Sequence, residues 1–219
     1  MADGGADPSG FSDDFEGVTL DPSWSVLRPE AVDVTLAQGA LTLTFKQSAL
    51  WFNAERGVQV SKPITGDFVV TTIAHARKRT DPGAPPDATI HLAGIMARDP
   101  RSPPENYVFI VVGRDENDLS VESKTTVASV STYDGPTWPS GDAELRLCRV
   151  GSSFKMLKRA VGGGAWVVAR TEERPDLPAT LAVGPNAYAY LMAGGRPDFV
   201  ASFESVHFAP ANSAADCER

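Results

Sequence analysis

The carboxylates that could hydrolyse a glycosidic bond gather in one short stretch of the chain. Glu116, Asp118 and Glu122 form the candidate cluster, in a predicted strand and the turn before it. Retaining hydrolysis needs two carboxyl groups about 5–5.5 Å apart, whereas four strand residues would separate Asp118 from Glu122 by about 13 Å. The run Arg114–Asp118 also has the Asn and Asp content of a polar turn. The sequence therefore predicts no catalytic residues here.

Large aromatic side chains at two places could stack on sugar rings. Trp51 stands beside Phe52, and one of the two points away from the core because adjacent strand residues face opposite sides of a sheet. Trp138 lies in a loop with two prolines, where a large side chain is less easily buried. Sugars present apolar CH faces that aromatic plates can hold. We therefore predict Trp51 and Trp138 as ligand-binding residues.

Polar residues on predicted neighbouring strands would complete such a site. Arg98, Tyr107, Glu122 and Lys124 are each polar where an apolar residue would otherwise fit. Their hydrogen-bonding groups could hold sugar hydroxyls, so we predict them as ligand-binding residues as well. The alternative is that Trp51 and Tyr107 cap the core while the charged residues form cross-strand pairs.

The composition excludes several classes of partner. A formal net charge of -8 argues against a nucleic-acid partner, which would require clustered Lys and Arg on one face. No apolar run approaches the roughly 18 residues of a membrane span, and the first ten residues lack the basic and apolar regions of a signal peptide. The chain is expected to be cytoplasmic if Met1 is the native start, and secreted or at the cell surface if a signal was removed. The sequence does not specify an oligomeric state.

The two cysteines lie in different settings. Cys148 stands within a predicted strand and Cys217 lies close to the carboxy terminus. The two cysteines could form a disulfide with each other. We expect them to be unpaired, because two cysteines do not make the disulfide framework of a small secreted domain.

The elements that must position these residues are strands. Nineteen glycines and seventeen prolines are spread along the chain and leave few uninterrupted windows for a helix. Period-two alternation is clearest in Glu144–Trp166, which predicts a strand, a turn, a second strand and a glycine turn. The proline-rich segment Thr80–Asp87 predicts an exposed loop. Strands are predicted over Val32–Thr35, Ala40–Phe45, Ala49–Phe52, Val58–Ser61, Gly66–Ala76, Ile90–Arg98, Asn106–Gly113, Leu119–Thr126, Leu145–Val150, Phe154–Val161, Trp166–Arg170, Thr180–Val183, Ala187–Met192 and Ala201–Ala209.

So many short strands predict an all-β fold in which two antiparallel sheets pack face to face. No repeat of fixed period is present, which disfavours a propeller or a solenoid. We expect a single β-sandwich domain over residues 11–209. A flexible amino-terminal tail over residues 1–10 and a carboxy-terminal tail over residues 210–219 would flank it.

Read in order, several segments resemble the concanavalin A-like lectin/glucanase superfamily, and specifically its small bacterial members of the DUF1349 type. The similar segments read FSDDFEG, LDPSW, ALTLTF, ALWF, GDFVVTT, LAGIMARD, ENYVFIVV and LRLCRVGSSFKMLKRAVGGGAW. The last of them keeps the glycine and the tryptophan of the family pattern but lacks its aspartate. The resemblance implies a jelly-roll sandwich with one concave face, on which a glycan site would lie.

Sandwiches of this superfamily often bind calcium on the convex side. Asp13, Asp14 and Glu16 supply hard oxygen ligands and form the candidate calcium site. Solvated acids at the start of a strand would have the same composition. The three histidines stand singly, and none has a second ligand at the spacing of a zinc site.

The sequence leaves three candidate functions to be tested. The first is a non-catalytic, lectin-like sandwich that recognises carbohydrate on its concave face. The second is a glycoside hydrolase-like enzyme of the same superfamily. The third is a structural or protein-interaction module without a small ligand, which would assemble through an unpaired sheet edge. The residue pattern favours the first.

Overall fold

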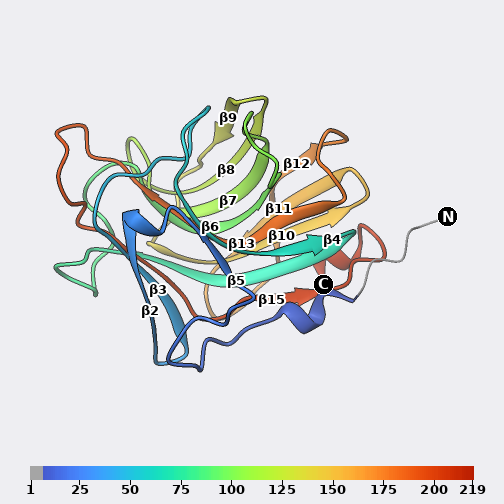
Figure 1. Cartoon of the computed structure of the whole chain (residues 1–219), viewed down its shortest axis with the longest axis horizontal. Helices are drawn as coiled ribbons and strands as arrows, with labels where there is room; N and C mark the ends of the chain where they lie inside the picture. Colours follow the sequence, from blue (N-terminus) through green and yellow to red (C-terminus); the bar gives the residue numbers. More distant parts are fainter. Residues whose placement is uncertain (1–6) are drawn as a thin grey trace.

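The computed structural model describes residues 7–219 and consists of two antiparallel sheets packed face to face (Figure 1). The seven-stranded sheet has the order β1 (Ser25–Leu27), β4 (Val58–Thr65), β13 (Thr180–Ala189), β6 (His91–Arg98), β7 (Tyr107–Arg114), β8 (Leu119–Val127) and β9 (Val130–Asp134). The eight-stranded sheet has the order β12 (Val167–Glu173), β11 (Ser153–Arg159), β10 (Asp142–Val150), β5 (Phe68–Arg77), β14 (Val200–Phe203), β3 (Ala40–Phe45) and β2 (Val32–Ala37), with β15 (His207–Ala209) beside β5. The predicted all-β sandwich is confirmed.

Short 3-10 helices complete the described chain. They are η1 (Pro8–Phe11), η2 (Pro29–Ala31) and η3 (Asp216–Glu218). Within residues 7–219 no helix is long and apolar enough to cross a membrane. Of the predicted amino-terminal tail, residues 1–6 lie outside the described residues, and Pro8–Phe11 forms η1.

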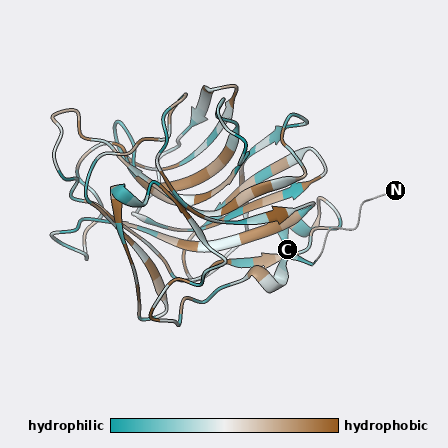
Figure 2. Cartoon of the chain, viewed as in Figure 1, coloured by the Kyte–Doolittle hydropathy of each residue, from teal (hydrophilic) through white to brown (hydrophobic). Residues whose placement is uncertain are grey.

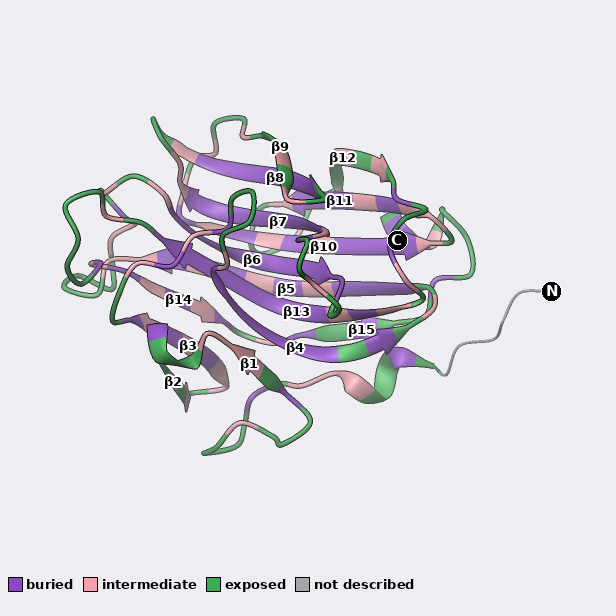
Figure 3. Cartoon of the chain, turned by 45° about the horizontal axis from the view of Figure 1, so that its top comes forward, coloured by how far each residue is buried: buried purple, intermediate pink, exposed green. Residues whose placement is uncertain are grey.

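The core lies between the two sheets because alternate residues of each strand point inward. In β3, Leu41, Leu43 and Phe45 are buried while the residues between them are half-buried. Apolar residues, brown in Figure 2, run along the strands of both sheets. β6 and almost all of β7 are buried on both faces (Figure 3). Something must therefore cover the face of the seven-stranded sheet that points away from the core.

That face, here called the outer face, is concave because β6 to β8 arch around it (Figure 1). A second apolar cluster lies on it, separate from the main core. Its buried members are Trp51, Leu92, Met96, Tyr107, Phe109, Val111 and Tyr188. The outer face is thus partly filled rather than open along its whole length.

The predicted strands match the structure with a few exceptions. The prediction of a strand over Ala49–Phe52 is wrong. Apart from an isolated bridge at Ala49, this segment is irregular backbone that covers the outer face. β1 and β9 were not predicted. The two strands predicted over Thr180–Val183 and Ala187–Met192 are one strand, β13, which ends at Ala189. The last predicted strand, Ala201–Ala209, is divided into β14 and β15 by the loop that follows Phe203.

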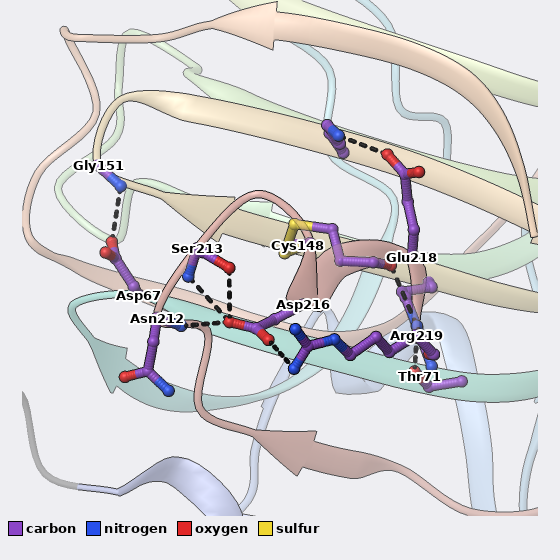
Figure 4. Close-up of a disulfide and its surroundings, with 12 residues drawn as sticks. Asp67, Thr71, Cys148, Gly151, Asn212, Ser213, Asp216, Glu218 and Arg219 are labelled. Carbon is purple, nitrogen blue, oxygen red and sulfur yellow. Dashed lines mark hydrogen bonds and ion pairs between the residues drawn. A yellow bond between two sulfur atoms is a disulfide. The ribbon is translucent and has the colours of Figure 1, made fainter.

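The carboxy-terminal segment is docked on the eight-stranded sheet. Cys217 forms a disulfide with Cys148 of β10 (Figure 4), so the expectation of unpaired cysteines is wrong. The Arg146 guanidinium donates a 3.0 Å hydrogen bond from Nη1 to the carbonyl of Cys217. Asp216 accepts hydrogen bonds from the backbone N–H groups of Asn212 and Ser213, both 2.9 Å long. Residues 210–219 are therefore held by a covalent bond and by a folded turn.

Candidate functional site

The strand register brings the predicted polar residues together on the outer face. Arg98 of β6 lies opposite Tyr107 of β7, and Phe109 lies opposite Lys124 of β8. Glu122 lies two residues before Lys124 in β8, so both side chains are on the same face of the sheet. The prediction that these strands are neighbours in one sheet is confirmed.

A segment over residues 46–57, here called the crossing segment, covers the middle of this face. It pairs with the end of β13 through reciprocal backbone bonds of 2.9 Å between Ala49 and Ala189. It reaches the opposite edge at β9, where Asn53 and Ser131 exchange hydrogen bonds of 2.8 and 3.0 Å. The crossing segment therefore runs over the strands from β13, the third strand of the sheet, to the edge strand β9.

Trp51 fastens the crossing segment to the sheet. Its indole is fully buried, packs edge-on against Tyr107 with ring centroids 5.3 Å apart, and donates to the Val58 carbonyl at 3.3 Å. Gly57 makes room for it, because a Cβ at that residue would lie 2.4 Å from Trp51 Cδ1. The expectation that Trp51 is an exposed plate is wrong: it faces the concave sheet, while its neighbour Phe52 is turned towards solvent.

A pocket of about 350 Å³ remains at the side of Trp51 nearest the β7–β8 turn. It is lined by Leu50, Phe52, Ile90, Leu92, Asp115, Glu116, Asn117, Glu122, Lys124, Tyr133, Asp134, Gly135 and Tyr188. Phe52 and Tyr133 are 37% and 46% exposed, and their rings meet edge-on at 6.4 Å. Two aromatic rings and several polar groups therefore surround one solvent-accessible hollow on the concave face.

Lys124 is the single cation of this lining and is almost fully buried. Its ammonium lies 3.0 Å from Glu122 Oε1 and donates to the Trp51 carbonyl at 2.9 Å. It also lies 5.0–5.5 Å from the ring centroids of Phe52, Phe109, Tyr133 and Tyr188. Burial lowers the pKa of Lys124, and the Glu122 carboxylate opposes that shift. The carboxylate and the ring faces compensate for the lost hydration of the ammonium.

Glu122 is held from two sides. Its Oε1 accepts a 2.8 Å hydrogen bond from the Tyr188 hydroxyl in addition to the ion pair with Lys124. Burial raises the pKa of Tyr188 well above its usual value, so this phenol stays a hydrogen-bond donor. The ion pair, together with this bond, fixes the orientation of the carboxyl group at the bottom of the pocket.

Arg98 and Tyr107 lie on the same face but outside the pocket lining. Arg98 makes a two-pronged ion pair with Glu105, at 2.7 and 2.9 Å, and Arg56 of the crossing segment adds a third bond at 2.5 Å. Burial alone would raise the pKa of Glu105, but the two guanidinium groups hold it below its usual value. Burial raises the pKa of Tyr107 to about 12. Both residues serve packing and ion pairing at this end, and their ligand roles stay predictions.

Trp138 lies elsewhere. It is half-buried against the main core, and its Nε1 donates to the Asp142 carbonyl at 2.8 Å. The Lys158 ammonium lies 5.1 Å from the indole ring. Trp138 does not line the pocket, so of the six predicted ligand residues the structure places Glu122 and Lys124 there.

The candidate calcium site is not assembled. Within residues 7–219 no group of three His, Cys, Asp or Glu side chains converges as a metal site requires. The Asp13 carboxylate accepts from the Phe15 backbone N–H at 2.8 Å and from Trp24 Nε1 at 2.7 Å. It therefore orders the start of the domain, because both oxygens already have protein donors.

The acid cluster of the β7–β8 turn divides between two roles. Asp115 Oδ1 accepts from the backbone N–H groups of Asn117 and Asp118 at 2.9 and 3.1 Å, which confirms the predicted polar turn. Asp115, Glu116 and Glu122 line the pocket, whereas Asp118 does not.

Sequence reasoning missed the aromatic rim of the pocket. The alternation argument applied to Trp51 and Phe52 contained a usable signal, since one of the two had to be exposed. No such signal exists in the sequence for Tyr133, because the residues of β9 are mostly exposed and lack apolar alternation. β9 follows β8 through a turn at Ala128 and Ser129, both of which have positive φ.

The fold has relatives among solved structures at low sequence identity. A functionally unknown protein from Saccharomyces cerevisiae superposes with a TM-score of 0.71 at 14% identity, covering 87% of this chain and 98% of that one. An immunostimulatory antigen and pseudo β-1,3-glucanase of Mycobacterium tuberculosis superposes with a TM-score of 0.60 at 13% identity, covering 92% and 98%. A xylan β-1,4-xylosidase from Bacillus halodurans gives 0.65 at 14%, covering 90% of this chain and 38% of that one.

These likenesses show the fold alone, a two-sheet β-sandwich. The chain spans about two fifths of the xylosidase, so the activity of that enzyme is not carried over. No protein-family model matches the chain, and no curated protein is similar to it in sequence. Membership of the DUF1349 type therefore stays a prediction.

Proposed function

We propose that this chain binds carbohydrate in the outer-face pocket beside the crossing segment and that it does so without catalysis. One observation carries the proposal: two partly exposed rings, Phe52 and Tyr133, border a concave pocket whose bottom holds the Lys124–Glu122 ion pair. Aromatic faces suit the CH surfaces of sugar rings, and fixed polar groups suit their hydroxyls.

The size and position of the pocket support the same function. About 350 Å³ lies at the lower end of the range for small-molecule pockets and suits one or two sugar units. The exposed aromatic rings at the rim leave their edges in water, as a reversible sugar site requires. The predicted plates Trp51 and Trp138 are replaced by Phe52 and Tyr133 in this proposal.

Hydrolysis is the second candidate, because Glu116 and Glu122 line the same pocket. The Glu122 oxygen that faces Lys124 and Tyr188 is already engaged as an acceptor, which supports a binding role over an acid one. Release of reducing ends from polysaccharides, lost in Glu122→Gln, would establish the enzyme instead.

Glycan-array screening followed by calorimetry tests the binding proposal. Phe52→Ala or Tyr133→Ala should weaken binding by about five- to tenfold, the loss of one aromatic contact. Tyr190→Ala is the matched control, because Tyr190 is as exposed as Phe52, at 37%, but does not line the pocket. Binding to no glycan, or binding that both pocket variants leave unchanged, would refute the proposal. Concentration-dependent self-assembly with no glycan binding would favour the interaction module.

A further inference from the structure

The Glu122 carboxylate at the bottom of the pocket uses its two oxygens unequally. Oε1 accepts from the Tyr188 hydroxyl at 2.8 Å and lies 3.0 Å from the Lys124 ammonium. Within residues 7–219, no hydrogen bond reaches Oε2. The Glu122 side chain is only 6% exposed, yet Oε2 is not one of the enclosed polar atoms that lack a partner. Solvent therefore reaches this oxygen, through the pocket that Glu122 lines.

The neighbours of Glu122 hold Oε2 in place as a hydrogen-bond acceptor. The Tyr188 hydroxyl stays a donor because burial raises its pKa, and a lysine ammonium can only donate. Lys124 is itself held by its 2.9 Å hydrogen bond to the Trp51 carbonyl. The carboxyl group cannot rotate without breaking its contacts to both donors. A ligand in the pocket therefore meets a fixed, charged oxygen that has no other partner.

This oxygen restricts which ligand groups can lie next to it. A ligand that fills the pocket displaces water from Oε2 and must replace its hydrogen bond. A sugar hydroxyl can donate that bond, and a charged acceptor makes it a strong one. A methyl ether, an ester or a sulfate has no proton to donate and would leave the buried oxygen unpaired, which is how polar sites reject close analogues. A sulfate would also bring a second negative charge against the carboxylate.

We infer that Glu122 determines specificity in this pocket. Its Oε2 accepts a hydrogen bond from one hydroxyl of a neutral, unsubstituted sugar, whose ring contacts Phe52 and Tyr133. Sugars in which that hydroxyl is methylated, acylated or sulfated are excluded. The inference rests on the proposed carbohydrate binding, and it adds the class of ligand and the hydrogen-bonding role of one atom.

Ligand-detected NMR titration with methyl β-D-glucopyranoside and its analogues tests the inference. In the analogues, one hydroxyl at a time is replaced by hydrogen, by fluorine or by a methoxy group, none of which can donate a hydrogen bond. At one ring position all three replacements should weaken binding by about tenfold or more, the scale of a hydrogen bond to a charged group. If the glycan array identifies a different terminal sugar, the methyl glycoside of that sugar replaces the glucoside in the same series.

Variants of Glu122 show whether this residue causes the effect. In Glu122→Gln the amide oxygen should occupy the place of Oε1, because two donors face it, and the amide NH2 then replaces Oε2 with a donor. The penalty for fluorine at the sensitive ring position should fall severalfold. Glu122→Asp keeps the charge beside Lys124 but withdraws the oxygen, so it should also reduce the penalty and serves if the first variant does not fold.

Asp118→Asn is the matched control for the loss of one negative charge. Asp118 is an exposed acid of the preceding turn and does not line the pocket. This variant should therefore keep the full penalty for fluorine.

The outcomes separate the inference from the proposed function. Tolerance of fluorine at every ring position overturns the inference while carbohydrate binding stands. An equal change of the penalty in the Glu122 variants and in Asp118→Asn also overturns it. If no glycan binds on the array, or if binding ignores both Phe52→Ala and Tyr133→Ala, the proposed function falls, and the inference falls with it.

Discussion

Removal of the disulfide gives a test whose magnitude follows from the structure. Cys148 and Cys217 are 69 residues apart in sequence. In the chain-entropy model, a cross-link that closes such a loop restricts the unfolded state and thereby stabilises the fold by about 4 kcal/mol at 25 °C. The double variant Cys148→Ala/Cys217→Ala should therefore lose about 4 kcal/mol. This is a large share of the roughly 5–15 kcal/mol that stabilises a domain.

Equilibrium unfolding in guanidinium chloride, followed by tryptophan fluorescence, measures this loss in the double variant and in the reduced wild type. The slope of the transition should increase in both, because the unfolded chain without the cross-link exposes more surface. A loss below about 1 kcal/mol would refute the loop-closure reasoning. Two titratable thiols in the unreduced, denatured wild type would refute the bond itself.

Three further changes test the packing around the site by the same unfolding measurement. Gly57→Ala should lower the free energy of unfolding by about 1–3 kcal/mol, because the added Cβ overpacks against Trp51. Gly10→Ala is the control: its Cβ would meet nothing within 4 Å, so its effect should stay within about 0.5 kcal/mol. Equal effects of the two changes would contradict the contact between Gly57 and Trp51. Lys124→Met should cost about 3–5 kcal/mol, because it leaves a buried carboxylate without its ammonium, and a neutral result would rule that out. The folded-state pKa of Glu105 lies below its usual 4.5, so its stabilisation is present above that pH and is lost as the pH falls through the folded value. Glu105→Gln should therefore flatten the decline of stability between pH 5 and pH 2, and an unchanged acid limb would contradict this.

Most strands could be predicted because their alternation survives in the sequence. Ala40–Phe45 alternates buried and half-buried residues along its whole length, as a strand with one face on a core must. Ala49–Phe52 has the same apolar content for another reason, since it covers a sheet instead of joining one. An apolar residue type predicts that a residue is buried, but it does not predict whether the residue belongs to a strand or to a loop that covers a sheet. β9 was missed for the opposite reason, because an edge strand with exposed residues lacks the apolar signal.

The candidate site could be predicted only in part. Glu122 and Lys124 were identifiable as charged residues in an otherwise buried strand. Their surroundings were not, because Phe52 and Tyr133 come from segments about 80 residues apart that tertiary packing alone brings together. The disulfide belongs to the same class of features, because the spacing of two cysteines does not specify whether the chain folds them into contact.

Under the proposed carbohydrate binding, the crossing segment limits which part of a polymer the pocket could accept. An uncovered concave sheet is a trough, in which a polysaccharide can lie at full length with its interior units bound. Here residues 46–57 bridge the trough from β13 to β9, and Trp51 fills the space beneath. A chain of sugars in the remaining pocket of about 350 Å³ would be stopped by the crossing segment. The bridge thus turns a through-groove into a blind socket, suited to polymer ends, branch tips and short oligomers rather than to the middle of a long strand.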